Sequence, residues 1–190
     1  MRKLLVTAAL ASAMAVSAPA NAGFFDFTLA PYVGASAGES TTDSCITGTC
    51  DDADTAWKVY GGLEVNEFIS MEVGYVELGE VEYSAPTGTR GTHGMILQLV
   101  GSYALGPKFT LLGRGGMNIL NTEVDGAVAG ARGNEGDTDV SWSLGLGAQY
   151  NFTKSVGLRL EWERYFEVGD PDSTGEADVD LLTAGVVFKF

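Results

Sequence analysis

Hydrophobic and polar residues alternate with a period of two along most of this chain. The pattern is clearest between residues 155 and 166. There the apolar positions are Val156, Leu158, Leu160 and Trp162, and the residues between them are Gly157, Arg159, Glu161 and Glu163. Successive side chains of a β-strand point to opposite faces, so this pattern predicts a strand with one apolar and one polar face. The same alternation recurs in Ile69–Tyr75 and Val140–Tyr150.

The pattern predicts eight strands separated by turns of two kinds. The expected strands are 27–38, 55–66, 69–83, 92–105, 108–122, 138–151, 155–167 and 178–190. Each is long enough for a tilted strand to cross a bilayer, which takes about 9–11 residues. The connections alternate between short turns at 66–68, 106–107 and 151–154 and longer polar loops at 39–54, 84–91, 123–137 and 168–177. Short turns on one side and long loops on the other are typical of an up-and-down barrel.

The polar faces of these strands consist mostly of glycine, serine and scattered charges. Such a face is too small and too polar for the core of a soluble sandwich, but it suits the narrow lumen of a membrane barrel whose apolar face contacts lipid. No stretch after the N-terminal region approaches 18 consecutive apolar residues, so no transmembrane helix is expected. The sequence therefore predicts an all-β fold, an eight-stranded antiparallel up-and-down transmembrane β-barrel.

Aromatic residues gather at the predicted strand ends, as they do in the belts at membrane interfaces. They are Phe24, Phe25, Phe27, Phe68, Phe109, Tyr150, Phe152, Phe188 and Phe190. The alternative interpretation makes them core residues of a soluble β-protein.

The first 22 residues have the pattern of a secretory signal peptide. Arg2 and Lys3 form a basic region, residues 4–16 are apolar, and Ala20-Asn21-Ala22 fits a cleavage site before Gly23. An uncleaved membrane anchor would need about 20 apolar residues. We therefore expect a signal peptide at 1–22, one barrel domain at 23–190, and export to the bacterial outer membrane.

Composition narrows the function classes. The formal net charge is −14, and loss of Arg2 and Lys3 with the signal peptide makes it −16. Such a chain is repelled by nucleic-acid phosphates, and it matches anionic lipid head groups only if divalent cations intervene. The 26 glycines are about twice the usual share of ~7%.

The two cysteines, Cys45 and Cys50, lie in one polar loop. An exported chain meets an oxidising periplasm, so we expect a disulfide that closes this loop. Two thiols without a nearby His or further Cys do not complete a tetrahedral zinc site.

Several stretches of this chain resemble the transmembrane domain of outer-membrane protein A and related small porin-like barrels. They are Pro31–Ala35, Val65–Tyr75, Gly113–Met117, Leu158–Trp162 and the C-terminal Val187–Phe190. The resemblance covers essentially the whole mature chain, through the order and spacing of the pieces. It implies that Phe188 and Phe190 belong to a C-terminal signal read by the barrel-assembly machinery.

The resemblance also implies a network of charges in the lumen. The family's Glu in strand three and Arg in strand seven match Glu72 and Arg159, but its lumenal Lys and Glu fall on Val100 and Gln149. These departures put the family's charge-pair gate in doubt. We predict a different network formed by Lys58, Glu64, Glu72, Arg114, Arg159, Glu161 and Glu163. Its role is expected to be structural, because buried charges must be paired and eight strands leave an interior just wide enough for side chains.

Candidate catalytic and metal-binding residues are few. A barrel hydrolase that acts on lipid A would need a Ser two residues after its His, and here Met95 follows the single histidine, His93. The segment Asp170–Glu176 faintly resembles a calcium loop, but Leu181 occupies the position of the bidentate Glu. We expect no enzyme activity, no cofactor and no metal site, although divalent cations that bridge the acidic loops to lipopolysaccharide phosphates stay an alternative.

The expected function is that of a structural or surface barrel that presents acidic extracellular loops. The alternatives are a narrow porin-like channel for small solutes and a lipid A-modifying enzyme. The expected partners are outer-membrane lipid, lipopolysaccharide and the barrel-assembly machinery, and we expect a monomer.

Overall fold

The computed structural model describes residues 29–42, 50–51, 53–84, 87–126, 135–169 and 176–190. Its strands are β1 (Ala30–Thr42), β2 (Cys50–Asp51), β3 (Ala53–Glu64), β4 (Ile69–Ser84), β5 (Thr87–Ala104), β6 (Phe109–Gly126), β7 (Glu135–Asn151), β8 (Val156–Val168) and β9 (Ala177–Lys189). The predicted signal peptide, its cleavage site and the aromatic residues at 24–27 lie outside the described residues.

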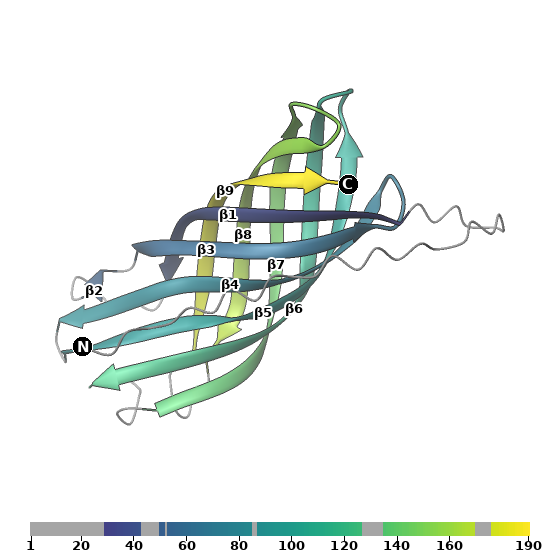
Figure 1. The fold of residues 1–190 in the computed structure, drawn as a ribbon. Helices are drawn as coiled ribbons and strands as arrows, with labels where there is room; N and C mark the ends of the chain where they lie inside the picture. Colours follow the sequence, from purple (N-terminus) through teal and green to yellow (C-terminus); the bar gives the residue numbers. More distant parts are fainter. Residues whose placement is uncertain (1–28, 43–49, 52, 85–86, 127–134, 170–175) are drawn as a thin grey trace, which may run out of the picture.

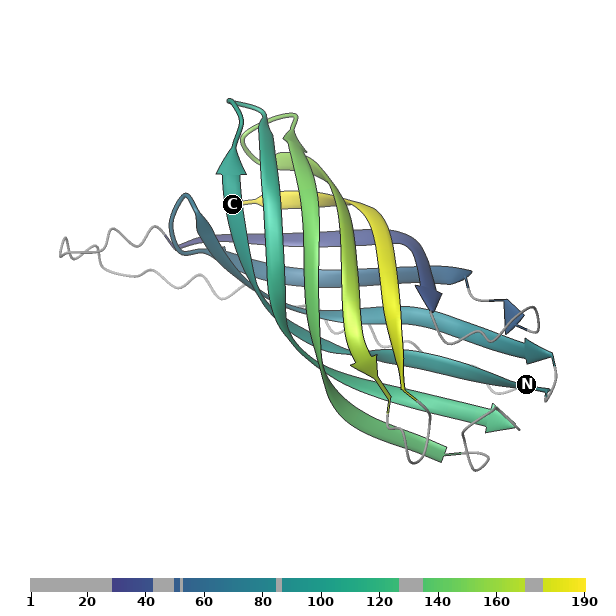
Figure 2. The ribbon, with the colours of Figure 1, turned by 180° about the vertical axis from the view of Figure 1, so that it is seen from behind.

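Eight of these strands close into a barrel, shown from two sides in Figures 1 and 2. The order is β4-β3-β1-β9-β8-β7-β6-β5, and a further pairing between β4 and β5 closes the ring. Every pairing is antiparallel. The predicted fold class, an eight-stranded antiparallel barrel, is confirmed. Among the described residues, no helix has the length and apolar character needed to cross a bilayer.

The short turns lie together at one end of the barrel and are built by local hydrogen bonds. Asn66 Oδ1 accepts hydrogen bonds from the backbone amides of Phe68 and Ile69, both at 2.8 Å. Thr153 Oγ1 accepts from the amides of Ser155 and Val156 at 3.2 and 3.0 Å. Asn and Thr side chains that take over backbone donors in this way favour tight turns.

The strands extend further on one side of the barrel than on the other. Strands β4 to β7 have 16 to 18 residues, whereas β1, β3, β8 and β9 have 12 or 13. In Figure 2 the ends of β4 to β7 project beyond those of β8 and β9. Within the predicted loops 84–91 and 123–137, residues 87–91, 123–126 and 135–137 are strand. The alternation continues there, with Arg90 and Val124 buried. The first loop also contains β2, which pairs with β4.

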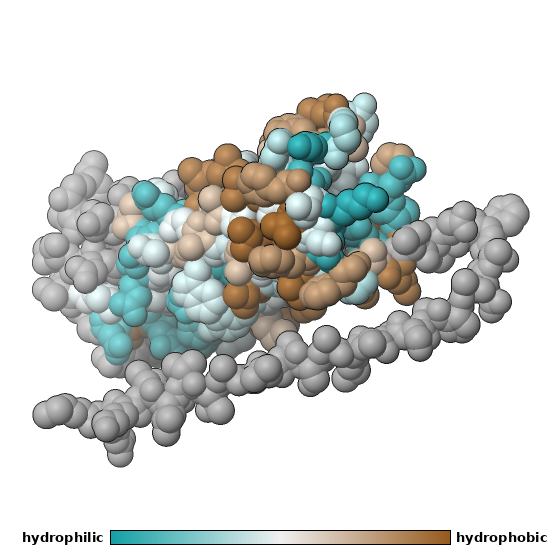
Figure 3. Space-filling model, turned by 45° about the horizontal axis from the view of Figure 1, so that its top comes forward, coloured by the Kyte–Doolittle hydropathy of each residue, from teal (hydrophilic) through white to brown (hydrophobic). Residues whose placement is uncertain are grey.

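The outer face of the barrel is apolar over its middle. Leu97, Leu144 and Leu146 point outward and are 52%, 61% and 66% exposed. In water such a continuous apolar surface would cause association, whereas in a bilayer it matches the hydrocarbon. Figure 3 shows brown, hydrophobic side chains over the middle of the wall, with teal, hydrophilic ones on both sides of them, toward the left end and toward the short-turn end on the right.

The apolar band ends at a ring of polar residues on the outer face, on the side away from the short turns. The ring contains Glu39, Thr55, Glu77, His93, Asn121, Thr138, Arg164 and Asp180. Many of its members are register partners, among them Glu39 with Thr55, and His93 with both Glu77 and Asn121. A membrane-spanning wall is expected to end at this ring, where the outward side chains change from apolar to polar.

The interior has two layers of opposite character. The layer at membrane level is polar and charged. Above it, an apolar layer is formed by Ala56, Val76, Leu78, Ile96, Leu120, Tyr165, Val168, Val179 and Leu181, which are 0–5% exposed. The inner face, predicted to be mostly glycine, serine and charges, is therefore interrupted by an apolar layer. The apolar layer lies at the level of the polar ring: Leu78, Tyr165, Val168 and Val179 are beyond it, and the other five residues are just inside it. Burial of these side chains gives the usual hydrophobic stabilisation.

A charge cluster in the lumen as the candidate functional site

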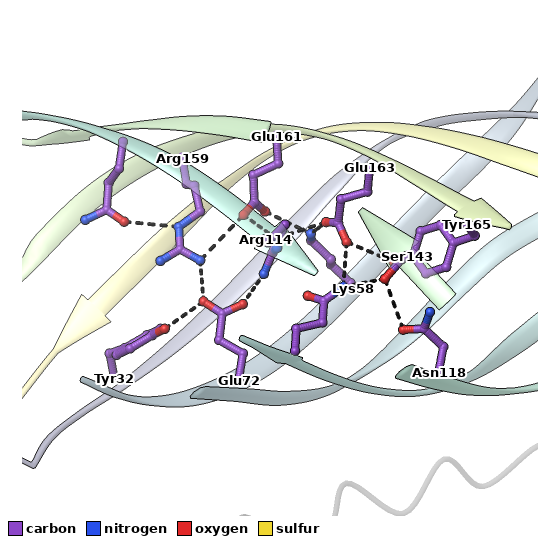
Figure 4. A network of polar contacts seen from close by, with 12 residues as sticks. Tyr32, Lys58, Glu72, Arg114, Asn118, Ser143, Arg159, Glu161, Glu163 and Tyr165 are labelled. Atoms are coloured by element: carbon purple, nitrogen blue, oxygen red, sulfur yellow. Dashed lines mark hydrogen bonds and ion pairs between the residues drawn. The ribbon is translucent and has the colours of Figure 1, made fainter. Parts of the chain in front are cut away.

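Six of the seven predicted network charges meet inside the barrel (Figure 4). Lys58 lies on β3, Glu72 on β4, Arg114 on β6, and Arg159, Glu161 and Glu163 on β8. All six are 0–5% exposed. Strand alternation places each of them on the inner face, and the three on β8 occupy every second position of that strand.

Glu72 is shared by two guanidinium groups and a phenol. One of its carboxylate oxygens, Oε1, accepts hydrogen bonds from Arg159 Nη1 at 2.6 Å and from the Tyr32 hydroxyl at 2.7 Å. The other oxygen is in contact with Arg114 Nη2. Both oxygens of this buried carboxylate are therefore occupied by donors, as a buried charge requires.

The second half of the cluster is built around Glu161 and Glu163. Lys58 Nζ lies 2.9 Å from Glu161 Oε2 and also contacts Glu163. Arg114 Nη1 lies 2.9 Å from Glu163 Oε1 and also contacts Glu161. Because Arg114 contacts all three carboxylates, it joins the two halves into one network.

The cluster is electrically balanced. It contains three cations, Lys58, Arg114 and Arg159, and three carboxylates, Glu72, Glu161 and Glu163. Equal numbers of opposite charges in direct contact offset part of the large cost of taking ions out of water.

Neutral side chains complete the cluster on both sides. Glu163 Oε2 accepts hydrogen bonds from the Gln98 amide at 2.9 Å and from the Tyr165 hydroxyl at 3.1 Å. The rings of Tyr32 and Tyr60 lie 5.6 and 5.2 Å from the Arg159 guanidinium carbon, within the range of cation–π attraction.

Two inward-facing glycines make room for these tyrosine rings. A Cβ at Gly62 would lie 2.2 Å from Tyr32 Cζ, and one at Gly34 would lie 2.4 Å from Tyr60 Cζ. Larger residues at these two positions would displace the rings that pack on Arg159.

The structure places the seventh predicted residue, Glu64, outside the cluster. It lies at the short-turn end, about a third exposed, and contacts Lys189. Glu64 is six residues from Lys58 along β3, which corresponds to about 20 Å of strand. The alternation in the sequence correctly placed Glu64 on the same face of β3 as Lys58. It does not give the height of Glu64 along the barrel axis, and this height separates it from the cluster.

The two departures from the family pattern find compensation in neighbouring residues. Val100, at the position of the family's lumenal Lys, is the register partner of Arg114, so the cation is supplied by the adjacent strand. Gln149, at the position of the family's Glu, accepts a hydrogen bond from Arg159 Nε at 3.0 Å.

Several contributors to the cluster were missed by the sequence analysis. They are Tyr32, Tyr60, Gln98, Asn118, Ser143 and Tyr165. The alternation in the sequence places each of these residues on an inward-facing position. Only the closure of the barrel brings their positions on β1, β5 and β7 to the same height as the charges on β8.

His93 lies on the outer wall, away from the cluster. Its ring is 6.1 Å from that of Tyr75, and its register partners are Glu77 and Asn121. Ring stacking at the membrane boundary accounts for its position.

The remaining predicted sites fall largely outside the described part of the chain. Cys45 and the segment 170–175 lie outside the described residues, as does the side chain of Cys50, so the disulfide stays a prediction. Within the described ranges, no group of three or more His, Cys, Asp or Glu residues is arranged to hold a metal ion.

Comparison with known proteins identifies the family of this barrel. Residues 29–190 match the OmpA-like transmembrane domain. The chain belongs to this family. OmpA-like relatives include outer membrane protein A of Yersinia pseudotuberculosis, 29% identical over 134 residues, and that of Klebsiella pneumoniae, 28% identical over 136 residues. The matches cover 68–69% of this chain but only 38–40% of the relatives, so the chain spans less than half their length.

Solved structures with the same fold are small outer-membrane barrels. Neisserial surface protein A superposes with a TM-score of 0.68 at 16% identity, covering 84% of this chain and 97% of its own. The N-terminal barrel domain of Pseudomonas aeruginosa OprF has a TM-score of 0.55 at 11% identity, with 84% and 97% covered. The attachment invasion locus protein Ail of Yersinia pestis has a TM-score of 0.53 at 13% identity, with 85% and 97% covered. At these identities the likeness concerns the fold. The OmpA-like family and the apolar outer wall together establish an integral β-barrel of the bacterial outer membrane.

Proposed function

We propose that this protein is a closed structural barrel of the outer membrane that presents an acidic surface to the outside and forms no open channel. The observation that carries this proposal is the filling of the lumen by two successive layers, the ionic cluster and the apolar layer above it.

The two layers oppose ion passage for different reasons. In the ionic layer a passing ion would have to displace charges that are already in contact with one another. The apolar layer offers side chains such as Ile96, Leu120 and Leu181, at most 1% exposed, which cannot replace the water of a hydrated ion. A path for ions would require both layers to move.

Planar-bilayer recording of the purified barrel tests this proposal. We expect no discrete openings in the wild type, and none in a variant that disturbs only the ionic layer, Glu163→Gln. A variant that also hollows the apolar layer, Glu163→Gln with Leu120→Ala and Leu181→Ala, is expected to conduct. Discrete openings of the wild type would contradict the proposal and favour a narrow porin-like channel.

The proposed surface role rests on the charge of the extracellular end. Glu39, Glu77, Glu80, Glu123 and Asp125 lie on the outer face at or above the polar ring. The Ail structure was determined with the heparin analogue sucrose octasulfate. A polyanion of that kind would be repelled by this rim, so the partner of these loops is expected to be cationic or neutral, or lipopolysaccharide bridged through divalent cations.

We do not propose catalysis at His93. Its neighbours in register, Glu77 and Asn121, supply no nucleophile, and the residue two positions further along β5 is Met95. Mass spectrometry of lipid A from cells with and without the protein tests this point, and a lipid A species that depends on the protein would revive the enzyme hypothesis.

We further propose that residues 1–22 are removed on export and that the C-terminal strand carries the signal for the assembly machinery. Phe188 and Phe190 face outward on and after β9 and are 46% and 79% exposed. Because the barrel closes on itself through β4 and β5, no sheet edge requires a second copy at membrane level, and we expect a monomer.

A further inference from the structure

A polar cavity lies inside the short-turn end of the barrel, below the ionic cluster. Its volume is about 170 Å³, and its lining includes Glu64, Ser70, Ser102, Thr110, Gln149 and Arg159. Liquid water takes about 30 Å³ per molecule, so the cavity has room for roughly five waters or for one small solute. The ionic cluster closes its deep end, so a solute can enter and leave only on the periplasmic side.

The deep end of this cavity is lined by Arg159, whose guanidinium is only partly used by the ionic cluster. Arg159 is 4% exposed; its Nε donates to Gln149 and its Nη1 to Glu72. The contacts of Arg159 with Gln149, Glu72 and Glu161 are made through Nε and Nη1, and none of them uses the other terminal nitrogen, Nη2. Figure 4 shows one terminal nitrogen of Arg159 pointing away from Glu72 and Glu161. A guanidinium N–H that faces a cavity is suited to a carboxylate.

The glutamine at position 149 explains why Arg159 Nη2 is available to a ligand. The Nε and Nη2 groups of an arginine form a fork that a carboxylate can occupy with both oxygens. Gln149 offers only its single carbonyl oxygen, and its amide nitrogen donates to Asn151 at 2.7 Å. A Glu at this position, as in the family pattern, would satisfy the whole fork from within the barrel.

The rim of the cavity carries the opposite charge. Glu64 and Glu67 lie there with Lys189, which contacts Glu64. Among the residues that line this cavity at its mouth, two carboxylates stand against one ammonium, whereas Lys108 and Lys154 lie with Glu64 and Lys189 around a neighbouring hollow. The cavity therefore has a positive bottom and a negative mouth.

We propose that this periplasmic cavity binds a small zwitterion of the amino-acid class, with its carboxylate on Arg159 Nη2 and its ammonium toward Glu64 and Glu67. The hydroxyls of Ser70, Ser102 and Thr110 line the space between the two ends. A bound solute leaves by the side from which it entered, because the ionic cluster above the cavity blocks passage through the barrel.

Binding can be measured by NMR titration of the full barrel in detergent micelles, with alanine as the probe and acetate and ethylamine as half-ligands. We expect alanine to shift the resonances of residues around the cavity and to bind at least five-fold more tightly than either half-ligand. Gln149→Glu is expected to weaken alanine binding at least ten-fold, because the new carboxylate occupies the Arg159 fork. Gln149→Leu adds no charge and frees Arg159 Nε as well as Nη2, so it serves as the contrasting variant and is expected to bind alanine at least as tightly as the wild type.

The outcomes separate the possibilities. Absence of saturable shifts with alanine in the wild type means that the cavity holds water only, and the proposal is overturned. Equal binding of acetate and alanine overturns the role of Glu64 and Glu67, and equal weakening by both Gln149 variants overturns the role of the fork. Because Gln149→Glu restores the family residue, it is expected to fold, and dispersed amide signals in its spectrum check this directly.

Discussion

The two halves of the barrel interior are filled by side chains of opposite character, although both must be packed without empty space. At membrane level the wall is apolar outside and the lumen is filled by ions, tyrosines and amides. At the level of the polar ring the wall becomes polar outside and the lumen is filled largely by aliphatic side chains, such as Leu120 just inside the ring and Val179 just beyond it. On β6 the change occurs within a few residues, from buried Arg114 and Asn118 to buried Leu120 and Val124.

The difference follows from the solvent around each half. In the extracellular half the surroundings are water, so burying aliphatic side chains gives the usual hydrophobic stabilisation. In the membrane half the hydrocarbon outside is as apolar as any core, so an aliphatic filling would gain little over exposure to lipid. There the directional contacts of charges and hydrogen bonds are a more specific way to fill the ring.

The largest effect is expected from removing the central carboxylate of the membrane half. Glu72→Ala leaves Arg114 and Arg159 buried without their shared partner and should lower the free energy of unfolding by about 3–5 kcal/mol. Urea unfolding in lipid vesicles measures this. Thr183→Val is the control, since this buried hydroxyl has no hydrogen-bond partner among the described residues, and its loss should cost little. Equal losses in the two variants would mean that the cluster does not stabilise the barrel.

The apolar half should respond like the core of a soluble protein. Leu120→Ala removes a fully buried side chain and should cost about 2–5 kcal/mol. The neighbouring Ile119→Ala changes a side chain that is 53% exposed on the outer wall, and its cost in the same unfolding experiment should be clearly smaller. If the two losses were alike, the upper interior would not be a packed core.

The position of the boundary between the halves can be tested on the outer face. Leu97→Arg places a charge in the apolar band and should cost about 2–4 kcal/mol in vesicles. Glu123→Arg lies above the polar ring and should change stability by no more than about 0.5 kcal/mol. A large cost at position 123 would move the membrane boundary above the ring.

A smaller effect is expected when one ion pair of the cluster is removed as a unit. The double variant Lys58→Met with Glu163→Met keeps the remaining charges balanced. Gln98 and Tyr165 lose one hydrogen-bond acceptor, so the free energy of unfolding should fall by about 1–2 kcal/mol. Glu163→Met alone should cost more than the pair, because Lys58 then loses one of its two carboxylates. A double-mutant cycle on unfolding free energies gives the coupling, and additive losses would contradict a networked cluster.

Part of this architecture could be read from the chain without coordinates. The period of two gave the strand number, the turns at 66–68 and 151–154, and the inward parity of Lys58, Glu72, Arg114 and Arg159, because a strand sends alternate side chains to opposite faces whatever its surroundings. The alternation of short turns with long loops gave the barrel topology in the same way.

The alternation of apolar and polar residues does not predict the height of a residue along the barrel axis. Parity does not say that Glu64 lies some 20 Å from Lys58 along the strand, nor that Val100 stands beside Arg114, since the register between strands fixes both. The length of β4 to β7 above the membrane depended on pairing between strands, and so did the apolar layer they enclose.

What the amino-acid sequence determined by itself is therefore the two-sidedness of each strand and the number of strands, which follow from local backbone geometry. Only the tertiary structure decided which inward residues meet, because closure and shear of the ring bring distant strands to a common level. The balanced ion cluster, the apolar layer above it and the open donor of Arg159 below it all arise at that second stage.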